Sequence, residues 1–165
     1  CEGSLMQPEN GPAITSEASH SEAQRVLRTL LTGERLGVLS THHAGAPYAS
    51  LVAFVASEDT RRIVFATPRA TRKFRNIGAD PRVAMLIDNC NVPVDFEEAA
   101  AATATGEATE LTGDERAEAA VRFAAVHTHL REFLASPSTA LLCIEVDTYY
   151  VVRRFQHVTE LHLDQ

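Results

Sequence analysis

The sequence has 165 residues, of which 45% are hydrophobic, and a formal net charge of −7 at pH 7. This length and apolar content suit one globular domain with its own core, and the acidic balance argues against general nucleic-acid binding, which needs a broad basic surface. No apolar run approaches the roughly 20 residues of a membrane-spanning helix, and the first twenty residues lack the basic start and apolar centre of a secretory signal.

Residues 1–19 are rich in Pro, Gly, Ser and Glu and poor in apolar residues, which predicts a mobile N-terminal tail. Residues 20–165 are expected to form a single domain. It begins with a helix, because apolar residues recur at helical spacing between a capping Ser21 and Gly33. Short β-rich segments bounded by turn residues follow, and we expect strands at 36–41, 48–57, 62–67 and 81–88.

The segment 99–112 is ambiguous, because its alanines favour a helix while its threonines alternate and Gly106 interrupts it. We predict a strand there, since a turn and a clear helix from Gly113 follow, with a second helical piece at 127–135. The last expected strands are 139–147, 149–155 and an extra one within VTELHL. Six or more strands joined by short turns predict a mainly β protein, a mostly antiparallel β-barrel with flanking helices.

A basic segment, TPRATRKFRN at 67–76, stands out in this acidic chain and contains Lys73, the only lysine of the sequence. A short helix is expected to begin near Ala70, with its first free N–H groups beside Arg72 and Lys73. Helix N-termini attract anions, and basic residues there gain nothing from the helix dipole. The segment therefore suggests a bound anion such as a phosphate. A solvated charged face on a surface helix is the alternative.

Several motifs occur in a fixed order around this segment: GAP before an apolar strand, then IVFAT, TRK and DPRVAML. With these motifs, residues 23–90 resemble the pyridoxamine 5′-phosphate oxidase-like, FMN-binding split-barrel family. The resemblance implies a six-stranded antiparallel split β-barrel. It also implies a homodimer with FMN at the subunit interface.

The resemblance implies eight cofactor-binding residues on two segments. Arg72 and Lys73 would hold the FMN phosphate, and the residues at 50–52 would lie along the isoalloxazine ring and offer backbone groups to its polar edge. Thr67 and Thr71 would add hydroxyl donors. Ala66 would lie near the same site, whereas the other arginines of the segment, at positions 69 and 75, are expected to be solvated flank. The eight residues are Ser50, Leu51, Val52, Ala66, Thr67, Thr71, Arg72 and Lys73.

The implied function is that of an FMN-dependent oxidoreductase acting on a small molecule. Pyridoxamine phosphate is not the expected substrate, because the family's second lysine is missing from LVAFVAS and its C-terminal Arg-x-His motif has no clear match. We predict no catalytic side chain, since the cofactor carries out hydride or electron transfer itself. Two alternatives stay open: a haem- or deazaflavin-binding protein on the same fold, and a cofactor-free interaction protein.

Other constellations carry less information. The pairs His42-His43 and His127-x-His129 have no recognised metal-ligand spacing, so no metal site is predicted. The three cysteines also share no such spacing, which favours a reduced, cytoplasmic protein in which Cys90 is an ordinary thiol. One ring of Tyr149-Tyr150 should pack inside. Arg153-Arg154 is expected at an exposed strand edge, with a second anion site as the alternative.

Overall fold

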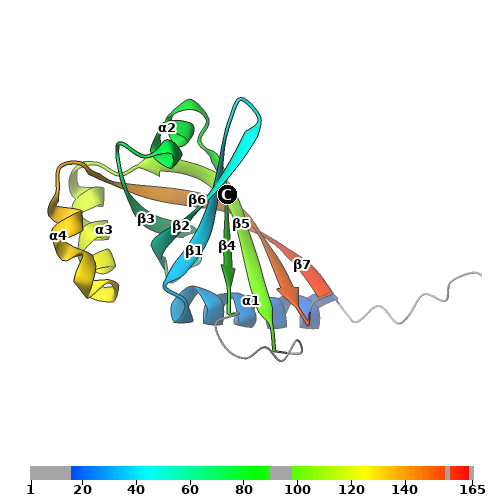
Figure 1. Cartoon of the computed structure of the whole chain (residues 1–165). Coiled ribbons are helices and arrows are strands. Elements are labelled where there is room, and N and C mark those ends of the chain that lie inside the picture. The colour runs from blue at the N-terminus through cyan, green and yellow to red at the C-terminus, as the bar shows by residue number, and fades with distance from the viewer. Residues whose placement is uncertain (1–15, 90–97, 155–156, 164–165) are drawn as a thin grey trace, which may run out of the picture.

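A computed structural model describes residues 16–89, 98–154 and 157–163 (Figure 1). The described strands form one antiparallel sheet in the order β3-β2-β1-β4-β5-β6-β7. An additional pairing of β3 with β6 closes β1 to β6 into a barrel, and β7 extends the sheet beyond β6. The predicted six-stranded antiparallel barrel is therefore confirmed. The strands are β1 (Leu36–His43), β2 (Ala46–Ala56), β3 (Arg62–Pro68), β4 (Arg82–Asp88), β5 (Ala100–Glu110), β6 (Thr139–Arg153) and β7 (His157–His162).

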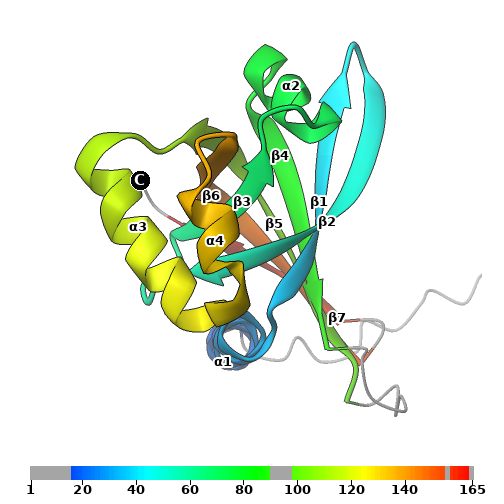
Figure 2. The same ribbon diagram turned by 60° about the vertical axis from the view of Figure 1, so that its left-hand side comes forward.

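Helices cover the two ends and one outer side of this barrel. α1 (Ser16–Gly33) crosses one end, and α2 (Arg72–Ala79) lies at the other end beside the β1–β2 hairpin (Figure 1). α3 (Gly113–Val126), the 3₁₀ turn η1 (Thr128–Leu130) and α4 (Arg131–Ala135) pack together against the outside of the sheet (Figure 2). No helix in the described part of the chain is long and apolar enough to cross a bilayer.

The core has two parts, because the strands alternate and some of them are covered on both faces. Phe54, Phe65 and Tyr149 are fully buried in the larger cluster inside the barrel, where the apolar face of α1 also packs. A smaller cluster around Phe123 and Leu141 lies between the outer helices and the sheet. One ring of the tyrosine pair is thus buried, as predicted, and the Tyr149 hydroxyl donates to the Thr60 carbonyl at 2.6 Å.

Two predictions of element bounds differ from the structure. The first helix begins at Ser16 rather than at Ser21. The predicted strands 139–147 and 149–155 are one continuous strand, because the chain stays extended through a register shift opposite Gly106. A Cβ at Gly106 would lie 2.0 Å from the Glu145 carbonyl oxygen, so only glycine fits at this bulge. The tail up to residue 15 and Cys90 lie outside the described residues.

Candidate functional site

The first turn of α2 is built by two threonines. Thr71 caps the helix: its backbone is extended, and its Oγ1 accepts a hydrogen bond from the Phe74 N–H at 3.4 Å. The hydroxyl of Thr67, the buried next-to-last residue of β3, lies 3.0 Å from the Thr71 hydroxyl. Thr71 also donates to the Pro68 carbonyl at 2.9 Å. The helix thus begins at Arg72, two residues later than expected, with both predicted threonines beside its N-terminus.

Arg72 and Lys73 are the first two residues of α2, at the end where the helix dipole disfavours positive charge. The Arg72 guanidinium lies over the ring of Tyr48, 4.7 Å from its centroid. Lys73 is partly buried, and burial lowers the pKa of its ammonium group. Within the described ranges, neither cation forms an ion pair with a carboxylate. Two uncompensated positive charges therefore meet at one helix N-terminus.

The barrel opens beside this helix end. β2 and β3 pair over only three positions, which on β2 are Phe54–Ala56, while β3 continues along β6 to Pro68. The Phe54 N–H bonds to the Arg35 carbonyl on the β1 side. Because hydrogen-bonding direction alternates along an antiparallel strand, the backbone groups of Leu51 point to the diverging side. The edge of β2 next to α2 thus offers backbone donors and acceptors to a ligand.

The predicted strand residues differ in how their side chains lie. Val52 is buried in the core, so only its backbone can contact a ligand, whereas Leu51 is exposed on the outer face. The Ser50 hydroxyl is buried and has no hydrogen-bond partner among the described residues. Ala66 packs toward the outer helix cluster, away from the threonines. The structure thus brings Thr67 and the first turn of α2 beside β2.

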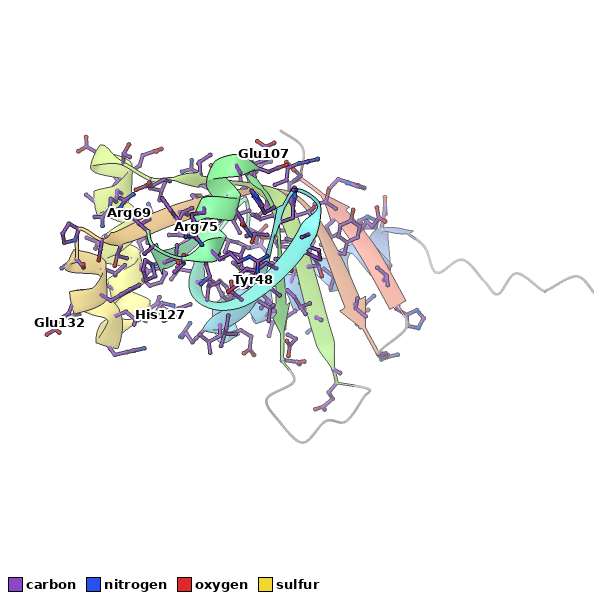
Figure 3. All side chains as sticks on the ribbon, turned by 45° about the horizontal axis from the view of Figure 1, so that its top comes forward. Tyr48, Arg69, Arg75, Glu107, His127 and Glu132 are labelled. Atoms are coloured by element: carbon purple, nitrogen blue, oxygen red, sulfur yellow. The ribbon has the colours of Figure 1, made fainter. Side chains whose placement is uncertain are left out.

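Sequence reasoning missed Tyr48, which holds Arg72, although it lies two residues before Ser50 on the same strand face. Arg69 is exposed, as predicted. Its guanidinium also forms a two-point salt bridge with Glu110, which the sequence did not indicate. Arg75 is exposed, as predicted. Figure 3 shows Tyr48, Arg69 and Arg75 around α2, and His127 with the outer helices.

Polar residues elsewhere have structural partners. His127 is buried, with its Nε2 2.8 Å from the Phe54 carbonyl, and the His42 Nε2 lies 3.2 Å from Asp80. No group of three or more His, Cys, Asp or Glu side chains among the described residues could hold a metal ion. Arg153 is paired with Glu22 and largely buried, so its expected exposed position is wrong. It lines a cleft of about 490 Å³ near α1 that contains none of the eight predicted residues.

The chain was compared with known proteins. The family model described as "Pyridoxamine 5′-phosphate oxidase" matches residues 23–153, and no curated protein matches the sequence. The structure is similar to the haem-binding protein from Mycobacterium smegmatis, with a TM-score of 0.76 at 20% identity, and the match covers 85% of this chain but only 57% of that one. General stress protein 26 from Bacillus anthracis gives 0.66 at 21% identity, covering 86% and 98% of the two chains. The haem storage protein HutZ from Vibrio cholerae gives 0.66 at 13%, covering 79% and 94%. Identities this low establish the shared fold alone.

Proposed function

Since the chain belongs to the pyridoxamine 5′-phosphate oxidase family, as its motifs predicted, we propose that it binds FMN and acts as an FMN-dependent oxidoreductase. One observation carries the proposal: two cations without carboxylate partners in the described chain meet two threonine hydroxyls at the N-terminus of α2. Phosphate is the anion that this donor set suits, because guanidinium, ammonium, hydroxyl and helix N–H groups all donate to it.

The residues present fit the parts of FMN. Arg72 and Lys73 would hold the phosphate, and the hydroxyls of Thr67 and Thr71 would donate to it after turning away from each other and from the Pro68 carbonyl. The open backbone edge around Leu51 would meet the polar edge of the ring, and the partnerless hydroxyl of Ser50 lies on the same strand. The bound flavin would supply hydride or electron transfer, while the protein binds and orients it. We assign no catalytic side chain and no substrate, and we do not expect pyridoxamine phosphate.

A homodimer with the cofactor at its interface forms part of this proposal. The outer sheet face beside the open edge of β2 carries exposed apolar side chains: Leu51 is 62% exposed, Leu36 51% and Leu86 39%. Leu51 and Leu86 lie in register on either side of Val38 across β2, β1 and β4. A second copy covering this row would bury it and close the cofactor site.

A Leu86→Arg variant should be monomeric by light scattering and should bind FMN more weakly.

Haem or a deazaflavin on the same fold is the second candidate, because two structural neighbours are described as haem proteins. Two of this chain's histidines already have partners: His127 with a carbonyl and His42 with Asp80. A cytoplasmic location also stays a prediction. An absorbance spectrum of the purified protein, with mass spectrometry of the released ligand, separates the candidates. Flavin bands support our proposal, and a Soret band without flavin binding supports haem.

A matched pair of ligands tests the phosphate assignment. FMN and riboflavin differ only in the phosphate, so the ratio of their dissociation constants isolates its contribution. Each charge-assisted hydrogen bond contributes about 1.5–3 kcal/mol, so the double variant Arg72→Gln/Lys73→Gln should weaken FMN binding by roughly 100-fold or more. Riboflavin binding should stay unchanged. Undiminished FMN affinity in the double variant removes the assignment.

A further inference from the structure

Arg69, the residue after β3, is fastened to three other parts of the chain. Its Nη1 donates to Glu110 Oε2 at 2.8 Å, and its Nη2 donates to the other carboxylate oxygen. Its backbone N–H donates to the Ser138 carbonyl at 2.9 Å, continuing the β3–β6 pairing by one residue. The guanidinium lies 5.6 Å from the centroid of the Phe74 ring on α2. Arg69 therefore joins β5, the start of β6 and α2.

These contacts act on the short turn from Pro68 to Thr71, which sets the position of the helix N-terminus. The Thr71 N–H bonds to the Pro68 carbonyl at 3.2 Å, so the turn is tight and has Arg69 at its second position. On its other side, the helix start is held by the stacking of Arg72 on Tyr48. Without the link to Glu110, this turn would lose its side-chain anchor to β5 and would keep only the pairing of its backbone with the start of β6.

We propose that Arg69, held by Glu110, is a positioning residue that fixes the turn 68–71 so that Thr71, Arg72 and Lys73 together meet a phosphate; this inference rests on the proposed FMN function. The bidentate fork suits this role, because a planar guanidinium with two parallel hydrogen bonds fixes direction as well as distance. The pair also cancels its own charge. Arg69 thus differs from its neighbours Arg72 and Lys73, whose charges stay free for the ligand.

The Glu110→Gln variant separates a positioning role from a purely electrostatic one, because the two roles predict opposite changes in FMN affinity. Removing a carboxylate near an anion site should tighten phosphate binding if charge alone mattered. Positioning predicts weaker FMN binding, by about 10-fold for a coupled pair of this kind, with riboflavin binding unchanged. Arg69→Gln should give the same loss. The double variant should be no worse than either single one, and Arg69→Lys should restore little, since lysine lacks the fork.

Glu145→Gln serves as the matched control. Glu145 accepts a hydrogen bond from the Arg62 Nε at 2.6 Å at the opposite end of β3, and its loss should leave the FMN-to-riboflavin ratio unchanged. A purely structural role for Glu110 would lower both affinities together with the melting temperature, and would overturn the inference. So would unchanged or tighter FMN binding by Glu110→Gln while the double variant at 72 and 73 still loses FMN. If wild type and that double variant bind FMN equally, the proposed function fails and the inference fails with it.

Discussion

The two ends of helix α2 both carry charges of the sign that the helix dipole disfavours. Among the described residues, only the charge at the C-terminal end is paired with a side chain of opposite charge. At the N-terminus, Arg72 and Lys73 lack carboxylate partners within the described residues. At the C-terminus, the carboxylate of Asp80 accepts two hydrogen bonds from the Arg82 guanidinium, at 2.9 and 2.6 Å, and one from the Arg82 backbone N–H at 3.0 Å. The His42 Nε2 lies 3.2 Å away. Arg82 thereby holds the pKa of Asp80 well below its usual range.

This difference separates a structural ion cluster from a candidate binding site. The cluster around Asp80 is complete, because the Arg82 guanidinium from β4 offsets its charge and the His42 ring from β1 lies beside it. The first turn of α2 keeps two cations close together, which costs stability unless an anion binds between them. Basic residues at both places look alike in the sequence, and the presence or absence of a carboxylate partner distinguishes them.

The largest expected effect is on the stabilisation of the protein by FMN, which should depend on the cations at the N-terminal end of α2 and not on the ion cluster at its C-terminal end. FMN at 100 times its dissociation constant should raise the free energy of unfolding by about 2.7 kcal/mol, because it binds the folded state alone. The Arg72→Gln/Lys73→Gln variant should show almost none of this gain at the same FMN concentration, whereas Arg82→Gln should keep it. Urea denaturation with and without FMN measures all three. Equal stabilisation of both variants would mean that the two ends do not differ in the way proposed.

Without ligand, the two ends should respond to charge removal with opposite signs. Lys73→Gln should raise the stability of the free protein by about 0.3–1 kcal/mol at low ionic strength, since like charge leaves the positive end of the dipole. Arg72 is kept in this variant because its stacking on Tyr48 holds the helix start. High salt should remove most of this gain. Arg82→Gln should instead lower stability, because it leaves Asp80 without its main partner. A loss of stability in both variants would contradict the comparison.

The sequence predicted the barrel because alternating β-rich segments and turn residues are local signals. Arg72 and Lys73 were expected beside the free N–H groups of α2 and are its first two residues, although the helix begins two residues later than predicted. The partner of Arg69 could not be predicted, because Glu110 lies 41 residues further along and meets it only through the closure of the barrel. Gly106 was seen only as an interruption, although it marks the bulge in the β5–β6 pairing.

The pH dependence of FMN binding offers a smaller effect at the N-terminal end. Burial lowers the pKa of Lys73 in the free protein, and a bound phosphate would raise it again by favouring the charged form. FMN affinity should therefore be full at pH values below the free-protein pKa and fall as the pH rises from there through the higher pKa of the complex. Dividing the FMN affinity by the riboflavin affinity at each pH removes the effect of the titration of the flavin ring, which both ligands share. Above about pH 8, where the FMN phosphate is fully ionised, Lys73→Gln should make this ratio independent of pH. An unaltered slope in that variant would exclude Lys73 from the phosphate site.

The smallest expected effect is on the loss of protein stability at low pH, to which Asp80 at the C-terminal end of α2 contributes. The pKa of Asp80 is depressed in the folded state, chiefly by its hydrogen bonds with Arg82, so its contribution is present above the unfolded value of about 3.8 and is lost as the pH falls below it. Asp80→Asn should give a shallower loss of stability below that pH. Arg82→Gln should give an intermediate slope, because it removes the largest cause of the shift but keeps the hydrogen bond from the backbone N–H of residue 82. Neither variant should change the FMN-to-riboflavin ratio, because the cluster lies at the far end of α2 from the cations proposed to hold the phosphate. Acid-induced unfolding followed by circular dichroism measures the slope, and a change in the ligand ratio would show that the two ends of the helix are coupled rather than independent.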